Sequence, residues 1–161
     1  MKLKFFKTGG TIDKVYFDAK SEFEVGPPQV AELLTDANAT FEYEVESILR
    51  KDSLDMTEAD RARIRERVSA DPAAHIIVTH GTDTMILTAL ALKNIPGKTI
   101  VLTGSMQPAR LRVTDAGFNL GTAVAAVQTL PPGVYLAMNG QIFDPDHSRK
   151  NVAGHRFEAV G

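Results

Sequence analysis

Apolar runs of strand length alternate along the chain with segments whose apolar residues recur at helical spacing. A continuous apolar run is typical of a buried strand, and helical spacing is typical of a helix packed along one face. The predicted strands occupy residues 3–7, 41–48, 75–80, 98–104 and 133–140. The predicted helices occupy residues 26–37, 57–68, 83–94 and 114–130, and an irregular hairpin is predicted for 141–151. Thr57 and Asp60 have the spacing of a capping box.

Repeated strand-then-helix units predict an α/β fold of three layers, with a mostly parallel sheet covered by helices on both faces. Among flavodoxin- and Rossmann-like topologies we expect the flavodoxin-like strand order. Residues 41–48 alternate apolar and acidic side chains, which places that strand near a sheet edge. The 161 residues, 43% of them hydrophobic, predict one domain with one core.

The charge and cysteine content exclude several classes of function. The formal net charge is −2 with acids and bases interspersed, which argues against nucleic acid as a partner. The chain has no cysteine, so disulfides, thiol nucleophiles and thiolate metal sites are excluded, and we expect neither a metal nor a cofactor. The N-terminus lacks the apolar stretch of a signal peptide and no segment is long enough to span a bilayer, so we expect a cytoplasmic protein without a membrane partner.

Candidate chemistry gathers at the carboxyl ends of the predicted strands, which is where ligands bind to sheets of this kind. Glycines and polar residues lie at or just after the carboxyl end of each predicted strand, at Thr8–Thr11, at Ser53 and Asp55, at His80–Thr84, at Gly104–Met106 and at Met138–Gly140. The opposite ends of the strands carry ordinary turns. The sequence therefore predicts a binding site at one edge of the sheet.

The segment "KTGGTIDK", residues 7–14, has three possible readings. The glycines Gly9 and Gly10 permit a tight turn and a close approach of the backbone to a ligand. A phosphate cradle is disfavoured, because the segment lacks both the G-x-G-x-x-G spacing and a G-K-[ST] ending. The remaining reading is a loop that presents Thr11 as a nucleophile, provided that a base activates it.

The segment "HGTDT", residues 80–84, supplies groups that either cap a helix or assist that nucleophile. In both cases Thr82 and Asp83 lie beside free N–H groups of a helix N-terminus, which can hold a carboxylate or an oxyanion. Two bases are candidates. His80 is one, with a packed and hydrogen-bonded histidine as the alternative. Lys150 is the other, with a solvated surface lysine as the alternative.

These residues resemble the L-asparaginase family. "TGGTIDK" resembles the first signature of that family and "IIVTHGTDTM" resembles the second. "DSLDM" is similar to the substrate-loop segment S-Q-D-M, and "MNGQIFDPDHSRK" is similar to the strand and hairpin that carry the family's buried lysine. The resemblance covers nearly the whole chain, with the signatures in the expected order.

The resemblance implies hydrolysis of L-asparagine to L-aspartate and ammonia through a threonine acyl-enzyme. It implies that Thr11 is the nucleophile of a mobile loop, and that Thr82, Asp83 and Lys150 form a second catalytic cluster. Which threonine attacks first is left open. Ser53 matches the residue that holds the substrate α-carboxylate, and Asp83 also matches the residue that pairs with the α-ammonium. The implied substrate-binding set is Gly10, Ser53, Leu54, Asp55, Gly81, Thr82 and Asp83.

Three departures from the family pattern affect these expectations. The family's tyrosine near the mobile loop aligns with Phe23, and Tyr16 could supply the hydroxyl instead. Leu54 replaces the glutamine of S-Q-D-M. The family's smaller C-terminal domain has no counterpart here, so residues 1–161 are expected to form a single N-terminal-like catalytic domain. We also expect a homodimer or a larger homo-oligomer.

Three other functions compete with asparagine hydrolysis. A related amidase would act on another amide, and an amino-acid sensor would bind aspartate or asparagine through Ser53 and Asp83 without turnover. A nucleotide-binding flavodoxin-like module is disfavoured by the missing phosphate motif. The joint presence of Thr11, Thr82 and Lys150 favours an enzyme, since binding alone does not need the lysine.

Overall fold

The computed structural model describes residues 1–17, 22–25 and 29–161. A six-stranded sheet has the order β4-β1-β5-β6-β7-β8 and is parallel except for the antiparallel β8. Its strands are β1 (Lys2–Gly9), β4 (Glu42–Lys51), β5 (His75–Thr79), β6 (Thr99–Thr103), β7 (Gly133–Met138) and β8 (Gln141–Phe143). Numbered along the chain, the five parallel strands have the order 2-1-3-4-5. The predicted α/β class and flavodoxin-like order are confirmed.

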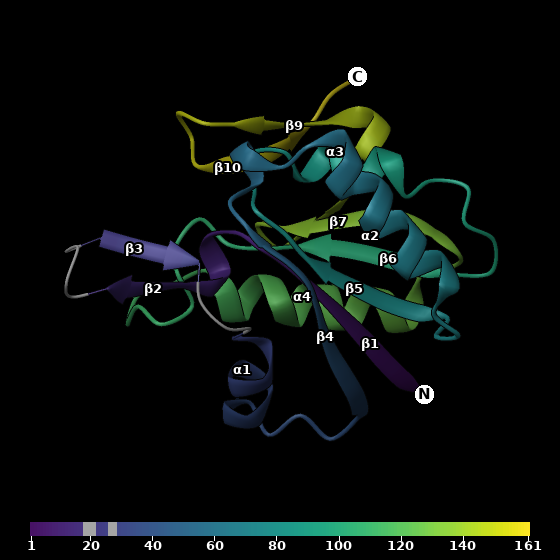
Figure 1. Cartoon of the computed structure of the whole chain (residues 1–161), viewed down its shortest axis with the longest axis horizontal. Helices are drawn as coiled ribbons and strands as arrows, with labels where there is room; N and C mark the ends of the chain where they lie inside the picture. Colours follow the sequence, from purple (N-terminus) through teal and green to yellow (C-terminus); the bar gives the residue numbers. More distant parts are fainter. Residues whose placement is uncertain (18–21, 26–28) are drawn as a thin grey trace.

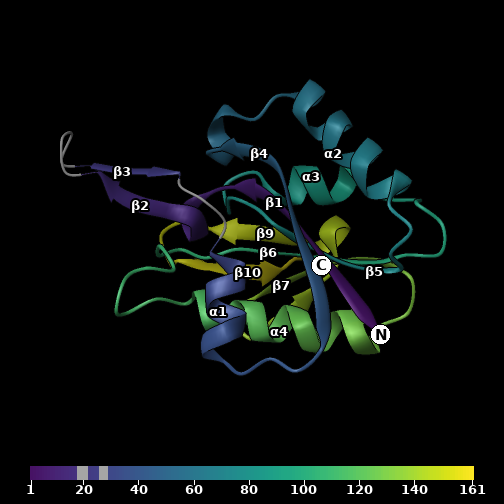
Figure 2. The same cartoon turned by 60° about the horizontal axis from the view of Figure 1, so that its bottom comes forward.

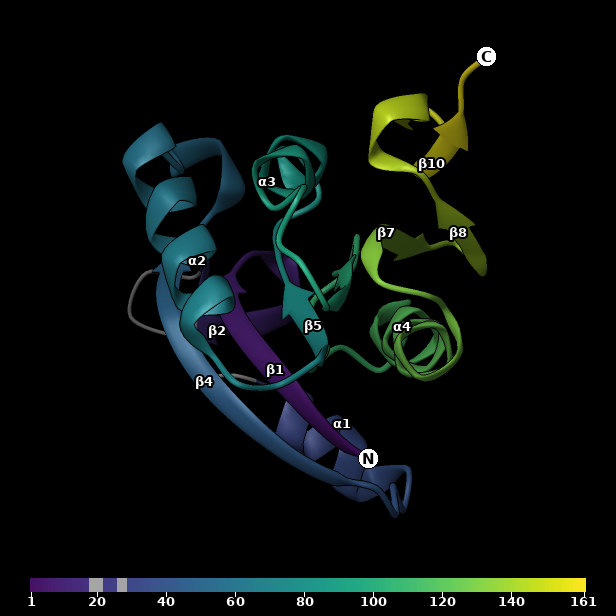
Figure 3. The same ribbon diagram turned by 90° about the vertical axis from the view of Figure 1, so that its right-hand side faces the viewer.

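Helices cover both faces of this sheet, as Figures 1 and 3 show. They are α1 (Val30–Asp36), α2 (Glu58–Ala70), α3 (Met85–Ala91) and α4 (Ala116–Thr129). The neighbouring residues Phe5 and Phe6 of β1 point into different cores, because successive side chains of a strand alternate between its faces. Phe5 packs with residues of α1 and α4, and Phe6 packs with residues of α2 and α3. In the described part of the chain, no helix has the length and apolar character needed to cross a membrane.

The four helices fall on the predicted segments: α1, α3 and α4 are shorter than predicted, whereas α2 extends two residues past its predicted end. Helix α2 begins with the predicted capping box, in which the Asp60 amide donates to Thr57 Oγ1 and the Thr57 amide donates to Asp60 Oδ2. Helix α3 ends at Ala91, before the predicted end, and the chain then turns through Asn94, whose φ is 65°. The prolines predicted to begin the first helix, Pro27 and Pro28, lie outside the described residues.

The hairpin predicted for residues 141–151 is wrong. Strand β8 pairs with β7, whereas β9 (Ser148–Asn151) pairs with β10 (Arg156–Ala159). Between β8 and β9 the chain forms a short 3₁₀ turn, which the side chain of Asp144 caps by accepting from the Asp146 amide at 2.9 Å. After this turn the chain continues into β9, which pairs with β10 and not with β8.

A second hairpin follows β1 and was not predicted. Strands β2 (Lys14–Phe17) and β3 (Glu22–Val25) pair antiparallel, with Tyr16 opposite Phe23. Figures 1 and 2 show that this hairpin projects from the body of the fold beside the carboxyl end of β1. It therefore continues directly from the segment that carries Thr11.

Candidate active site

The glycines after β1 make the close backbone approach that the sequence suggested. Gly9 and Gly10 have φ values of 110° and 92°, which side chains other than glycine rarely adopt. The Gly10 amide donates to the carbonyl of Lys51 at 3.0 Å. A Cβ built on Gly10 would lie 2.4 Å from the backbone nitrogen of Gly81. The segment that begins with Thr11 is therefore seated directly on the chain that follows β5.

The chain after β5 places a second threonine at the same edge of the sheet. Strands β1 and β5 are neighbours, at the point where the strand order reverses. Gly81 follows β5 and touches Gly10, so Thr82 and Thr11 each come directly after one of two contacting glycines. Thr82 is only 6% exposed, whereas the next residue, Asp83, faces solvent.

Lys150 reaches Thr82 and Asp83 from strand β9, far along the chain. Its ammonium donates to Thr82 Oγ1 at 2.8 Å and to Asp83 Oδ1 at 2.6 Å. The lysine side chain is 16% exposed, so it is not a solvated surface lysine. Its strand is anchored because Phe157, which pairs with Lys150 on β10, is buried in the core beside α2 and α3. These two bonds from the ammonium join Lys150, Thr82 and Asp83 in one cluster.

Ser53 completes the buried part of the site. A Cβ built on Gly81 would lie 2.6 Å from Ser53 Oγ, which shows how closely this side chain packs on the chain after β5. Thr84 fixes the serine through two bonds: its amide donates to Ser53 Oγ at 3.4 Å and its hydroxyl donates to the Ser53 carbonyl at 2.9 Å. Thr84 is the N-cap of α3, which begins at Met85, and no described side chain caps this helix. Thr82 and Asp83 therefore precede the helix and do not cap it, unlike the capping alternative that the sequence left open.

Three predicted site residues are not brought into this cluster. Leu54 is 73% exposed. Asp55 is also exposed, and within the described ranges it shares no hydrogen bond or ion pair with another predicted site residue. Tyr16 lies on β2, but its side chain falls outside what the structure describes.

His80 is a packed histidine, which resolves one of the open alternatives. It is completely buried, with Nδ1 2.7 Å from the Gly81 carbonyl and Nε2 2.7 Å from Thr88 Oγ1. Burial lowers the pKa of His80 to about 4. The ring is therefore neutral at physiological pH and turned away from solvent, so it is not placed to act as the general base.

Two buried charged residues on either side of Thr11 in the sequence were missed. Lys7 and Asp13 are both fully buried, and the backbone N–H of Gln29 donates to Asp13 Oδ1 at 2.8 Å. Lys7 Nζ and Asp13 Oδ2 have no hydrogen-bond partner among the described residues. Burial raises the pKa of Asp13 to about 6, while Lys7 and Arg50 oppose that rise. Strand alternation was the available signal, because it places Lys7 on the same buried face as Phe5.

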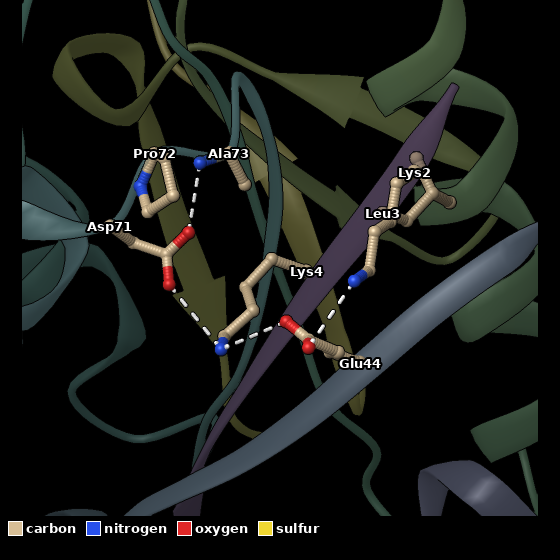
Figure 4. A pocket seen from close by; sticks show the side chains of 7 residues that line it. All are labelled: Lys2, Leu3, Lys4, Glu44, Asp71, Pro72 and Ala73. Carbon is tan, nitrogen blue, oxygen red and sulfur yellow. Dashed lines mark hydrogen bonds and ion pairs between the residues drawn. The ribbon is translucent and has the colours of Figure 1, made fainter.

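A hollow at the opposite end of the sheet is occupied by ion pairs. Figure 4 shows Lys4 reaching between Glu44 and Asp71, at 3.5 Å and 3.3 Å, where β1 and β4 begin. Glu46 also pairs with Lys4, at 3.1 Å. The carboxylates compensate the buried ammonium, so this hollow offers no free charge to a ligand. The residues with candidate chemistry therefore lie at the other end of the sheet.

Comparison with known proteins points to one family. The family described as Asparaginase, N-terminal matches residues 2–160. The L-asparaginase of Thermococcus kodakarensis is 33% identical over 156 residues, which are 88% of this chain and 45% of that protein. A solved structure of the thermostable L-asparaginase from the same organism has a TM-score of 0.87 at 30% identity, covering 99% of this chain and 51% of that chain.

One further relative carries a different name. It is a component of the glutamyl-tRNA(Gln) amidotransferase of Metallosphaera sedula, 31% identical over 159 residues, which are 89% of this chain and 35% of that protein. This chain spans about half the length, or less, of each of these relatives. The family match covers nearly every residue, and the fold agrees with it over the whole chain. The chain therefore belongs to the asparaginase family, in the part that the family's N-terminal domain represents.

Proposed function

We propose that this chain is an amidohydrolase that converts L-asparagine to L-aspartate and ammonia through a threonine acyl-enzyme. The observation that carries the proposal is the pair of bonds from Lys150 to Thr82 and Asp83 at the carboxyl end of β5. A partly buried lysine bonded to a hydroxyl is a proton-transfer arrangement, and ligand binding alone would not need it.

Thr11 is the proposed nucleophile. Its Oγ attacks the side-chain amide carbon of asparagine, and the oxygen–carbon bond forms as the carbon–nitrogen bond breaks. The hydroxyl proton is transferred to the leaving nitrogen, which departs as ammonia. Water then attacks the ester, gives one proton back to Thr11 Oγ and releases aspartate. The contact between Gly10 and Gly81 supports this role, because it brings the backbone that leads into Thr11 against the backbone that leads into Thr82.

Lys150 and Thr82 are the proposed proton carriers. The Thr82 hydroxyl accepts from Lys150, so its own proton is left to donate toward a substrate or a water molecule. The charge that develops on the substrate oxygen needs fixed donors, and backbone N–H groups near Gly10 and Thr82 are the candidates. Such donors are effective because the surrounding chain is buried and already in place.

The substrate's α-carbon groups are proposed to bind at Ser53 and Asp83. Ser53 presents a buried hydroxyl for the α-carboxylate, and Asp83 presents an exposed carboxylate for the α-ammonium. Leu54 cannot hydrogen-bond, so one anchor of the family pattern is missing. This loss also supports the second candidate function, hydrolysis of a different amide, because fewer α-carbon contacts make recognition of asparagine less stringent.

The test is ammonia release from L-asparagine and L-glutamine by the purified chain. We expect release from asparagine, with glutamine a much poorer substrate because its longer side chain needs firm anchors to reach Thr11. Turnover of other linear amides but not of asparagine would favour the related amidase. Tight aspartate binding without turnover of either amide would favour the sensor.

A further inference from the structure

His80 hydrogen-bonds to the residue that directly precedes Thr82. Its second partner, Thr88 on helix α3, is in turn bonded to Arg61 on helix α2. The Gly81 carbonyl lies 2.7 Å from His80 Nδ1, and Thr88 Oγ1 lies 2.7 Å from His80 Nε2. Arg61 Nε then lies 3.3 Å from Thr88 Oγ1. All three side chains are buried, with Arg61 4% exposed and the other two fully enclosed.

The direction of these bonds follows from what each group can do. A guanidinium has no acceptor, so Arg61 donates to Thr88 Oγ1. A carbonyl has no donor, so His80 Nδ1 carries the proton and donates to Gly81. Burial and the nearby charge of Arg61 lower the pKa of His80 to about 4, so the ring is neutral and Nε2 has no proton. Thr88 therefore donates to His80 Nε2.

The chain at His80 and Gly81 is also where the loops of the site meet. A Cβ on Gly10 would lie 2.4 Å from the Gly81 nitrogen, and one on Gly81 would lie 2.6 Å from Ser53 Oγ. A Cβ on Gly104, at the end of β6, would lie 2.2 Å from the His80 carbonyl oxygen. A rotation of this backbone would therefore displace the segment that carries Thr11 as well as Thr82.

We propose that Arg61, Thr88 and His80 form a directed hydrogen-bond relay that fixes the peptide between Gly81 and Thr82, which makes His80 a positioning residue for Thr82. In a trans peptide the N–H points away from the carbonyl, so holding the Gly81 carbonyl in the interior turns the Thr82 N–H the other way. The role in catalysis rests on the proposed function, whereas the relay itself does not.

Nuclear magnetic resonance of ¹⁵N-labelled protein tests the relay without any substrate. The four histidines are assigned by difference, with a His80→Asn variant identifying the ring of interest. We expect His80 at pH 7 as the neutral tautomer with Nδ1 protonated and Nε2 bare. A proton on Nε2, whether in the other tautomer or in the imidazolium, would overturn the relay.

Arg61→Met and Arg65→Met form a matched pair on helix α2. Arg65 donates to the carbonyls of Ala91 and Lys93 and takes no part in the relay. We expect Arg61→Met to shift the resonances of His80 Nε2 and of the Thr82 amide, and Arg65→Met to leave both in place. Identical spectra of the two variants at these nuclei would overturn the relay as a unit.

Two substitutions of His80 test positioning in catalysis. The amide nitrogen of asparagine falls near the place of Nδ1 and can still donate to the Gly81 carbonyl, whereas that of glutamine falls near Nε2. We expect kcat per folded molecule to fall about tenfold further in His80→Gln than in His80→Asn, because small displacements of reacting groups are costly. Equal kcat values in the two variants would overturn the positioning role. Absence of turnover in the unmodified chain would count against the proposed function alone, because the spectra still decide the relay.

Discussion

Gly10 and Gly81 lie backbone to backbone, so closely that a Cβ on Gly10 would approach the Gly81 nitrogen to 2.4 Å. The two loops come from neighbouring parallel strands, β1 and β5, at the point where the strand order reverses. Thr11 and Thr82 each follow one of these glycines directly. The contact therefore joins the two backbone segments that lead into Thr11 and Thr82, although the two threonines are far apart in sequence.

Replacing Lys150 should separate catalysis from binding. Lys150→Met keeps the apolar stem of the side chain but removes the donor to Thr82 and Asp83. We expect kcat for asparagine to fall by about 10²-fold or more, the size typical of losing an acid–base group. Aspartate affinity, measured by calorimetry, should change little because Ser53 and Asp83 remain.

Arg149→Met is the matched control for Lys150→Met. Arg149 is the preceding residue of β9, its side chain is 67% exposed, and it pairs with Glu158. We expect wild-type kcat in this variant. A pH–rate profile and a kcat unchanged in Lys150→Met would remove the lysine from the mechanism.

Leu54 tests the expected substrate affinity, because it stands at the position of the glutamine in the family pattern. Without the hydrogen bond that a glutamine would make there, we expect a KM for asparagine on the order of 1 mM, at the top of the usual enzyme range. Leu54→Gln should lower KM about fivefold at constant kcat, a gain of about 1 kcal/mol that is modest because Leu54 is 73% exposed. Leu54→Ala serves as the control and should leave KM near its original value. A low-micromolar KM in the unmodified chain would mean that another group, with Tyr16 and Asp55 the first to mutate, supplies the missing anchor.

The buried Asp13 should make the free energy of unfolding depend on pH. Its pKa of about 6 in the folded chain lies above its ordinary value of 3.8, so ionisation disfavours the folded state. The cost is absent below about pH 4, grows as the pH rises to about 6 and is constant above that. Asp13→Asn removes the ionisation while keeping an acceptor for the Gln29 amide. The variant should therefore gain stability relative to the wild type across this window, by up to about 3 kcal/mol.

Denaturant titrations at pH 4, 5, 6 and 7 measure this difference. Asp36→Asn, on the exposed surface of α1, is the matched control for the exchange of a carboxylate for an amide. A difference between Asp13→Asn and wild type that stays constant from pH 4 to pH 7 would contradict the assignment of a raised pKa.

Helix α3 offers a surface for the expected assembly. Leu87 and Leu90 are 52% and 38% exposed, one helical turn apart on a face that no described element covers fully. We expect a homodimer or a larger oligomer, measured by light scattering at micromolar concentration, and a shift toward monomer in Leu87→Glu. A monomer with full activity would rule out an active site that needs two copies.

The sequence predicted the sheet well because two independent signals agreed. Continuous apolar runs marked the central strands, and the acidic alternation of residues 41–48 marked an edge, where β4 lies. The hairpin of β2 and β3 was missed because neither strand is longer than 4 residues. The hairpin predicted for β8 and β9 was wrong, because β9 pairs with β10 instead. A local sequence pattern does not show that Phe157 of β10 is buried in the core.

The candidate site was predictable only in part. Thr11 and Thr82 stand out because glycines and polar residues interrupt apolar runs at strand ends. Lys150 was a candidate base, but its local pattern could not distinguish it from a solvated surface lysine, because its partners are 68 and 67 residues away. The partners of His80 were equally hidden, since Arg61 and Thr88 are 27 residues apart and look like an ordinary helix arginine and threonine.

The most direct test of the proposed mechanism is the position of the acyl group during turnover of asparagine. The reaction is stopped with acid in the steady state, and the chain is digested and analysed by mass spectrometry, for the wild type, Thr11→Ala and Thr82→Ala. Attack by Thr11 predicts an aspartyl group on the peptide that contains Thr11, and a kcat lowered by several orders of magnitude in folded Thr11→Ala. An aspartyl group on Thr82, or near-normal kcat in Thr11→Ala, would contradict it.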